Sequence, residues 1–449
     1  MKRLSNPQGI LRGPLLPQIF IYTVPIMLTS ILQLLFNAAD LVVVGRFCGS
    51  VSVAAVGATS SITNLIVNLL IGLSIGAGVT ISQAYGAENH NEVHRTVHTA
   101  ILIAIVGGLF LTVIGVLFSD TFLALMDTPK DVLPLSAVYM RIYFGGMVFT
   151  MLYNFCAAIL RAVGDTKSPL ISLFIAGFIN VLLNIVFVIV FDMDVAGVAL
   201  ATVISQAISA TLVLISLMKR NDCCKFVIKK IRFYKSQLIC IIKYGLPAGI
   251  QSSLFSLSNV LIQSSINSFG ANAVSGASAA HNIDGFVYVC LNAFHHTALN
   301  FVGQNYGAKQ HRRVMKVFWL CLASVTVIIS VLGFLVYSFG QELLSIYITD
   351  SPEAIKYGMI RLSYICLPYF VCGLMEVTTG ALRGLGMSIM PMAITVLGVC
   401  GLRIVWIETV FKAVNTLECL YLSYLVTWVI TFIEQFIAFL IIYKKKAEV

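Results

Sequence analysis

Twelve largely apolar stretches, the eighth of them the most polar, are each long enough to cross a lipid bilayer, and they constrain this chain more than any other feature. A membrane-spanning helix needs about 20 mostly apolar residues, and uninterrupted rather than alternating apolar runs exclude a β-barrel. Only 11% of the 449 residues are charged, against about 25% in soluble domains. The sequence therefore predicts an all-α integral membrane protein. The twelve predicted transmembrane helices are residues 17–44, 52–82, 97–118, 138–160, 169–191, 195–218, 244–268, 276–303, 316–340, 357–382, 390–411 and 419–443.

Basic residues are unevenly divided between the connections. Of the 29 Lys and Arg, 22 fall on one side of the predicted membrane and six on the other, and Arg403 lies inside a span. An excess of Lys and Arg marks the cytoplasmic side, so we expect both ends of the chain and the basic segment 219–243 to be cytoplasmic at the plasma membrane. Topology thus explains the net charge of +10. We expect a monomer whose partners are the bilayer and a small-molecule substrate, with no nucleic acid.

The two halves of the chain repeat each other at an offset of 221 or 222 residues. The paired segments are Tyr22–Pro25 with Tyr244–Pro247, Gln83–Ala87 with Gln304–Ala308, and Leu160–Pro169 with Leu382–Pro391. Because each half has an even number of spans, the repeat is parallel, and substrate sites in such transporters lie between the halves near the midplane. The predicted organisation is an N-terminal six-helix lobe (1–218), a basic linker (219–243), a C-terminal six-helix lobe (244–443) and a tail (444–449).

Asp40 is a single carboxylate within the first apolar stretch. A charge in hydrocarbon is costly, so such a residue usually faces a protein interior and marks an ion or substrate path. The alternative is an interfacial Asp that caps the end of its helix.

The motifs resemble those of the multidrug and toxic compound extrusion (MATE) family. The resemblance covers essentially the whole chain and rests on Asn37–Gly45, Gln83–Ala87, Leu160–Asp165 and Leu382–Gly386. It implies two six-helix lobes that export mostly cationic amphiphilic compounds, coupled to inward movement of Na⁺ or H⁺. No connection is long enough for a soluble catalytic domain, and no phosphate-binding loop is present. We therefore expect neither an enzyme nor a cofactor other than the coupling ion.

The resemblance also implies a cation site on Asp40, Asn180, Asn184 and Thr202. Asn184 stands where the family more commonly has an Asp, so a single carboxylate would hold the cation. Asn180 and Asn184 share one helix face, and carboxylate, amide and hydroxyl oxygens suit a hard cation such as Na⁺. A proton on Asp40 is the alternative, because desolvation favours the neutral acid. Hydrogen bonding between helices is the structural interpretation of the two Asn residues and Thr202.

Three further polar residues of the first half are candidates for a substrate or proton path. Asn64 and Asn68 repeat the four-residue spacing on the second span, where they would line the cavity or join helices. Asn154 corresponds to Glu376 under the 222-residue offset, so each is expected to face the interior of its own lobe.

A polar stripe runs along one face of the eighth span. Its members, three or four residues apart, are His281, Asp284, Tyr288, Asn292 and His295. A stripe at helical spacing faces inward and would receive protons, since His titrates near neutrality, or bind substrate. No third ligand accompanies His281 and Asp284 at a spacing suited to a metal.

Arg403 lies in the eleventh span, where its charge requires a partner. Depth along the helices favours an ion pair with Asp284, and Glu376 is the second choice. Such a pair would be either structural or part of a gate.

Pro25 and Pro247 occupy corresponding positions in the first helix of each lobe, where a missing hydrogen bond permits a bend. Gly72, Gly76 and Gly78 on the second span allow either close helix packing or flexing.

The sequence as a whole predicts a secondary active multidrug exporter that works by alternating access. Two alternatives remain open at this point. A flippase for a lipid-linked precursor would need a strongly cationic central cavity, and a membrane receptor or channel would not transport at all.

Overall fold

The structure, a computed structural model, describes residues 10–126, 128–349 and 351–447. Within these residues nearly the whole chain is helical and there is no β-strand. Nine of the described helices are long and apolar enough to cross a membrane, and two further pairs of helices, bent by 47° and 46°, reach that length together. The remaining long helix, α9 (Ala271–Gly307), has 37 residues but a more polar sequence. The nine helices, the two bent pairs and α9 together account for the twelve predicted spans. The all-α membrane fold is confirmed.

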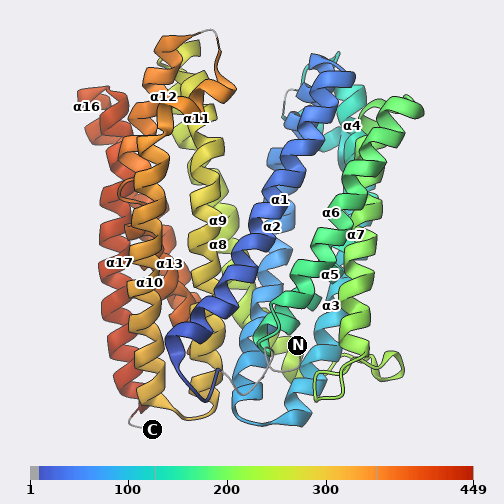
Figure 1. The fold of residues 1–449 in the computed structure, drawn as a ribbon, viewed down its shortest axis with the longest axis vertical. Coiled ribbons are helices and arrows are strands. Elements are labelled where there is room, and N and C mark those ends of the chain that lie inside the picture. Colours follow the sequence, from blue (N-terminus) through green and yellow to red (C-terminus); the bar gives the residue numbers. More distant parts are fainter. Residues whose placement is uncertain (1–9, 127, 350, 448–449) are drawn as a thin grey trace. The chain divides into compact units, whose positions relative to one another are not determined.

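Contacts divide the chain into two units (Figure 1). Unit 1 consists of Leu28–Gly249, and unit 2 consists of the described residues 10–27 and 250–447. The first helix of each half passes from one unit to the other two residues after its proline, Pro25 or Pro247. These units are defined by contacts and the predicted lobes by the repeat, so the lobe boundaries stay a prediction.

Unit 1 contains the helices of the first half, and its main hydrophobic core lies where α2, α3 and α5 pack together. Helix α7 packs against α4, α5 and α6. The helices are α1 (Leu15–Phe47, divided between the units), α2 (Ser50–Gly86), α3 (His90–Leu125), α4 (Leu133–Gly145), α5 (Met147–Ala162), α6 (Lys167–Ile185) with the π-helical η2 (Val186–Val190), α7 (Asp194–Met218), η3 (Ile228–Lys230) and α8 (Lys235–Asn267, also divided).

Unit 2 is built around α9, which packs against α10, α12 and α13 and is buried along much of its length. This burial explains how a helix with so many polar residues lies inside a membrane protein. The other helices are α10 (His311–Ser338), α11 (Gly340–Tyr347), α12 (Pro352–Ile365), α13 (Tyr369–Gly384), α14 (Ile389–Thr395), η4 (Val396–Gly401), α15 (Leu402–Trp406), η5 (Ile407–Phe411), α16 (Lys412–Val414) and α17 (Leu417–Ala447).

The internal repeat extends to details of the backbone. Helices α2 and α9 both have 37 residues and both follow a glycine with positive φ, 92° at Gly49 and 91° at Gly270. A residue with a side chain rarely adopts this conformation, so glycine is favoured at both turns. The π-helical segments η2 and η5 also occupy corresponding positions, 221 residues apart.

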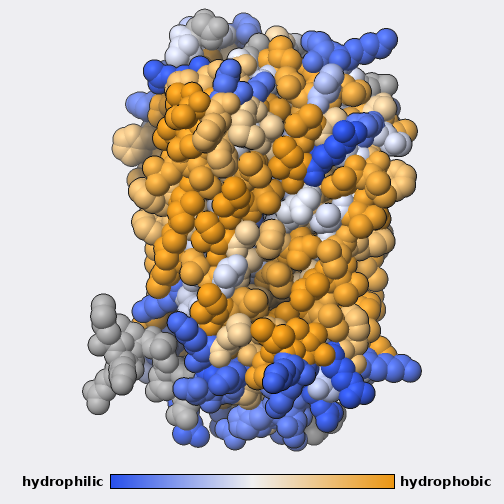
Figure 2. Space-filling model, turned by 90° about the vertical axis from the view of Figure 1, so that its right-hand side faces the viewer, coloured by the Kyte–Doolittle hydropathy of each residue, from blue (hydrophilic) through white to orange (hydrophobic). Residues whose placement is uncertain are grey.

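The outer surfaces of the helices are apolar where a bilayer would contact them. On α3, Phe110, Val113 and Leu117 are at least half exposed, and on α6 so are Phe174 and Phe178. Figure 2 shows hydrophobic residues covering the middle of one face, with hydrophilic residues at its two ends. Large exposed apolar side chains in such a band are typical of a multi-pass membrane protein.

Two of the three glycines singled out on α2 permit close helix packing. A Cβ atom on Gly76 would lie 2.2 Å from the Ile241 carbonyl oxygen of α8, and one on Gly72 would lie 2.2 Å from the Gly249 nitrogen. A Cβ on Gly78 would meet only the Ala158 oxygen, at 3.9 Å. Close contact of α2 with α8 in unit 1 therefore requires Gly72 and Gly76 but not Gly78.

The Gly76→Ala variant is expected to be less stable than the wild type by about 1–3 kcal/mol, the usual cost of overpacking. The matched Gly78→Ala variant, on the same helix, should keep or slightly raise stability, because Ala is favoured over Gly inside a helix by up to about 1 kcal/mol. Thermal unfolding of the purified variants, followed by circular dichroism, measures the difference. Equal stability of the two variants would contradict the packing described here.

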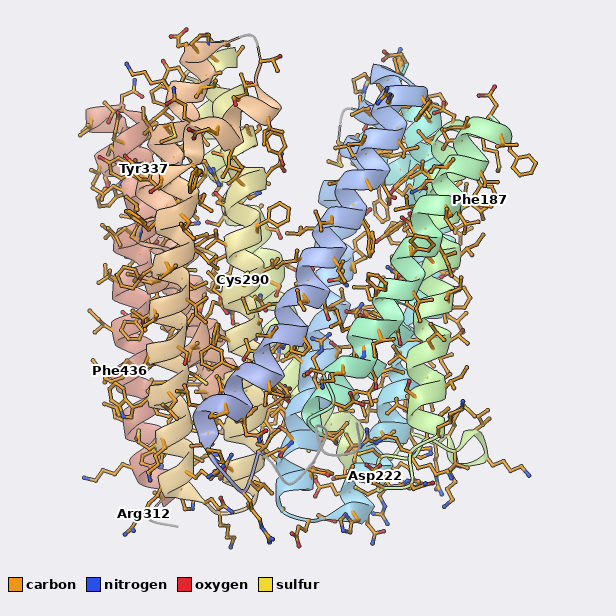
Figure 3. The ribbon with its side chains drawn as sticks, in the orientation of Figure 1. Phe187, Asp222, Cys290, Arg312, Tyr337 and Phe436 are labelled. Atoms are coloured by element: carbon orange, nitrogen blue, oxygen red, sulfur yellow. The ribbon has the colours of Figure 1, made fainter. Side chains whose placement is uncertain are left out.

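The connection between α7 and α8 is folded against unit 1. Arg220 Nε donates to Asp222 Oδ2 at 2.9 Å and Arg220 also lies 3.5 Å from Asp165, while the Val227 N–H donates to His98 Nε2 at 3.1 Å. Figure 3 labels Asp222 in this connection. Although burial alone would raise it, the hydrogen bonds and charge of Arg220 hold the pKa of Asp222 below its usual value. The linker is therefore an ordered part of unit 1.

Candidate cation site and buried charge clusters

The side chains of Asp40, Asn184 and Thr202 meet in unit 1, each from a different helix. Asn184 Nδ2 on α6 donates to Asp40 Oδ1 on α1 at 2.5 Å, and Thr202 Oγ1 on α7 donates to Asp40 Oδ2 at 3.2 Å. Asn184 Nδ2 also donates to Asn180 Oδ1 at 3.3 Å. Both Asn side chains are buried, and Asp40 and Thr202 are half-buried. We call these four residues the Asp40 cluster.

Apolar packing on both sides of the Asp40 cluster holds α1 against α6 and α7. A Cβ atom on Gly177 would lie 1.8 Å from Phe36, so the ring of Phe36 occupies the space left by this glycine. Phe36 precedes Asp40 by about one helical turn, as Gly177 precedes Asn180. On the other side, Val44 of α1 is buried in one cluster with valines from η2 and α7. The sequence thus places the carboxylate opposite the amides through local packing.

The Asp40 cluster contains an oxygen that is not used in hydrogen bonding. Asn184 directs its Nδ2 toward two acceptors, and its Oδ1 is buried without a hydrogen-bond partner among the described residues. Leaving a buried carbonyl oxygen unpaired costs about 1–3 kcal/mol. Carboxylate, amide and hydroxyl oxygens together form the donor set that hard cations prefer. The cluster therefore fits a sodium ion, and it equally fits a proton carried by Asp40.

The structure brings together all four residues predicted for the cation site. Helix α1 continues to Phe47, beyond Asp40, and the carboxylate hydrogen-bonds to side chains of two other helices. Cation binding by these residues stays a prediction.

The other polar candidates of the first half have different surroundings. The side chain of Asn64 lies outside the described residues. Asn68 on α2 is half-buried, and half-buried Asn154 on α5 donates to the Thr150 carbonyl oxygen of its own helix at 2.8 Å. A hydrogen bond within one helix is compatible with a purely structural side chain and equally with one that lines a substrate or proton path. A role of these residues in such a path therefore also stays a prediction.

In unit 2, Asp284 forms an ion pair that the sequence analysis did not identify. Arg361 on α12 donates to Asp284 Oδ2 from Nε at 3.0 Å and from Nη2 at 2.9 Å. His281 Nδ1 lies 3.3 Å from Asp284 Oδ1. Because Arg361 lies close to the start of its predicted span, it is one of the six basic residues that the sequence assigns to the second side of the membrane. Arg361 and Asp284 lie near the same end of their predicted spans. This shared depth in the membrane is the signal that could have identified the ion pair.

The predicted ion pair of Arg403 is wrong. Within the described part of the chain, Arg403 forms a salt bridge with neither Asp284 nor Glu376. Depth along a helix limits which residues can meet but does not determine which faces the helices turn toward each other, and α9 turns Asp284 toward α12. Arg403 instead lies against the ring of Tyr424 and donates to the hydroxyl of Ser258.

Glu376 belongs to a second buried group. His295 Nδ1 lies 2.9 Å from Glu376 Oε2, and His295 Nε2 lies 3.2 Å from Arg383 Nη1. Because a guanidinium can only donate, Nε2 accepts and the proton of His295 is on Nδ1. Arg383 Nη2 also donates to Gln251 Oε1 at 2.8 Å. His295 therefore links Arg383 to Glu376.

The stripe on α9 is thus divided between two clusters. Asp284 and His295 are buried, Asn292 is half-buried, and His281 and Tyr288 are exposed. Asp284 and His295 are about 16 Å apart along the helix axis, on either side of Cys290, which Figure 3 labels partway along α9. Each end of the stripe contacts a buried arginine, Arg361 at Asp284 and Arg383 at His295. A role of the stripe in a proton or substrate path stays a prediction.

Comparison with known proteins identifies one family and several relatives. The family model MatE matches residues 25–186 and 247–407. The probable multidrug resistance proteins YpnP and YoeA of Bacillus subtilis (strain 168) are 27% and 28% identical over 392 residues, covering 87% and 86% of this chain and 87% and 84% of their own. A solved outward-facing structure of a multidrug resistance MATE family transporter of the MOP superfamily has a TM-score of 0.91 at 18% identity, covering 99% of each chain. At that identity the likeness shows the fold.

Proposed function

Because this chain belongs to the MatE family, we propose that it is a secondary active multidrug exporter driven by inward movement of Na⁺ or H⁺. Relatives that it matches over most of their length are named as multidrug resistance proteins, which supports multidrug efflux. The observation that supports cation coupling is the Asp40 cluster, in which Asn184 of α6 donates from Nδ2 to the carboxylate of α1 and keeps a buried Oδ1 without a partner among the described residues.

The proposed mechanism depends on the charge of Asp40. In the present arrangement the carboxylate accepts from Asn184 and Thr202, which ties α1 to α6 and α7. An arriving Na⁺ would compete for the same oxygens, and a proton would remove the negative charge that strengthens both hydrogen bonds. A ligand shifts a conformational equilibrium only by its difference in affinity for the two states. Cation binding would therefore loosen α1 and favour the conformation that exchanges drug for cation.

The substrates that we propose are organic, mostly cationic amphiphilic compounds. We also propose a monomer in the plasma membrane with both ends of the chain in the cytoplasm. The excess of Lys and Arg in the connections on that side supports this orientation.

Efflux of a fluorescent organic cation from proteoliposomes tests the proposal. An inward sodium gradient and an inward pH gradient are applied separately, at constant membrane potential. We expect one of the two to accelerate efflux at least several-fold over vesicles without a gradient. Equal, slow movement under both gradients and in protein-free vesicles would refute the exporter.

A further inference from the structure

Arg403 is the most buried charged side chain in the described part of the chain, at 1% exposure. Its Nη1 donates to Ser258 Oγ of α8 at 3.4 Å, and its guanidinium carbon lies 4.1 Å from the centre of the Tyr424 ring of α17. Its Nε and Nη2 have no hydrogen-bond partner among the described residues. One face of the guanidinium is thus covered by the Tyr424 ring, and its Nε–Nη2 edge has no hydrogen-bond partner among the described residues.

The uncommitted edge is the one that binds carboxylates. Nε and Nη2 present two parallel N–H groups, a geometry that matches the two oxygens of a carboxylate. Arg361, in the same unit, uses these same two atoms to hold Asp284, although both donate to a single oxygen, Oδ2. The Nε–Nη2 edge of Arg403 is buried, and no hydrogen-bond acceptor among the described residues pairs with it.

The buried charges of unit 2 do not balance. The buried charged side chains of the described residues are three arginines and two carboxylates: Arg361, Arg383, Arg403, Asp284 and Glu376. Asp284 pairs with Arg361, and Glu376 is linked to Arg383 through His295. One positive charge, that of Arg403, remains. An isolated buried charge is very costly, so a negative group from outside the chain would stabilise this arrangement.

The position of Arg403 in the repeat corresponds to the position of the Asp40 cluster. The Asp40 cluster joins α1, α6 and α7. The neighbours of Arg403 come from α8 and α17, which repeat α1 and α7, and Arg403 itself lies on the helical segment that repeats α6. With the 222-residue offset, Tyr424 corresponds to Thr202. Arg403 also lies between the π-helical segments η4 and η5, and π-helical turns often occur at functional sites. The same place in the two halves thus carries opposite fixed charges.

We propose that Arg403 is the anchor of a carboxylate-binding site within unit 2. The Nε–Nη2 edge would hold the two carboxylate oxygens, Tyr424 would cover the guanidinium face, and the ligand would supply the missing negative charge. This site is independent of the exporter proposal, and it extends the class of ligands of this chain to carboxylates.

Binding of benzoate to the purified full-length protein tests the site without any ion gradient. We expect sodium benzoate to raise the thermal unfolding midpoint by several degrees, in a saturable manner, beyond the effect of sodium chloride at equal ionic strength. Fluorine NMR of 4-fluorobenzoate, whose resonance broadens on binding, measures the same interaction directly. Asp40→Asn should keep both signals, which separates this result from a failure of cation coupling.

Variants of Arg403 assign the effect to this side chain. Arg403→Gln should abolish both signals, and Arg403→Lys should weaken binding at least about tenfold, because Lys keeps the charge but not the paired N–H groups. Arg141→Gln, which removes an exposed arginine paired with Asp120, is the matched control and should bind as the wild type does. If Arg403→Gln does not fold, the assignment is tested by comparing benzoate binding of the wild type with that of Arg403→Lys and Arg141→Gln.

Three outcomes would overturn the assignment. The first is the absence of saturable broadening with the wild type. The second is a benzoate effect that Arg403→Lys and Arg403→Gln leave unchanged. The third is an equal effect of chloride and benzoate, which would indicate a response to salt or a halide site in place of carboxylate recognition.

Discussion

Replacing Asp40 with Asn is expected to abolish gradient-driven efflux while the protein still folds and inserts. Asn has nearly the same shape, so the packing of Phe36 against Gly177 is retained, but the cluster loses its only carboxylate. Interactions with a charged group contribute about 1.5–3 kcal/mol each, which corresponds to a cation affinity at least about tenfold lower. Efflux of a fluorescent cation from proteoliposomes with an imposed sodium or pH gradient measures the loss.

The control for this experiment is Asp120→Asn. Asp120 is an exposed carboxylate of α3 that pairs with Arg141, and its neutralisation should leave efflux close to the wild-type rate. Circular dichroism and detergent extraction show whether Asp40→Asn is folded. Wild-type efflux by the Asp40→Asn variant, at matched protein levels, would exclude the Asp40 cluster as the coupling site.

Replacing Arg361 with Met is expected to destabilise unit 2 by about 3–5 kcal/mol, because Asp284 would be left as a buried charge without its partner. For a unit of this size, such a loss lowers the unfolding midpoint by roughly 10 °C. The double variant Arg361→Met with Asp284→Leu removes both charges and should recover most of the loss, since replacing a whole buried ion pair by apolar residues is often neutral. Thermal unfolding of the purified proteins measures both effects.

Arg141→Met is the matched control for the ion pair. Arg141 and Asp120 are both about half exposed, and exposed pairs contribute about 0–1 kcal/mol. An Arg361→Met variant as stable as Arg141→Met would show that Asp284 is not held as a charge by Arg361. A double variant less stable than Arg361→Met alone would show that the apolar replacements do not fit the space.

The two halves of the chain have diverged in the chemistry of one structural position. In unit 1 the position carries Asp40, and in unit 2 it carries Arg403, which comes from a different helix of the repeat. The π-helical segments that follow the two positions, η2 and η5, correspond, whereas η4, which precedes Arg403, has no π-helical counterpart in α6. Charge can therefore change within the repeat without a change of fold, because the helices are held by apolar packing outside the polar cluster.

Much of the Asp40 cluster could be predicted from the sequence. Asn180 and Asn184 are four residues apart, which requires them to share a face of any helix they form, and the resemblance supplied the pairing with Asp40 and Thr202. The unpaired Oδ1 of Asn184 could not be predicted. Its state depends on which acceptors face the amide nitrogen, and that is decided by the rotation of α1 and α7 about their own axes.

The partners of the buried arginines in unit 2 were the part of the chain least accessible to sequence reasoning. Arg361 and Arg383 lie near the ends of predicted spans, where a basic residue ordinarily reaches water, and only the packing of α12 and α13 against α9 buries them. The amino-acid sequence alone determined the twelve spans and the repeat, since the length of an apolar run and the recurrence of motifs are properties of the chain itself. The tertiary structure decided which charges meet, because two residues at the same depth interact only when their helices turn the right faces toward each other.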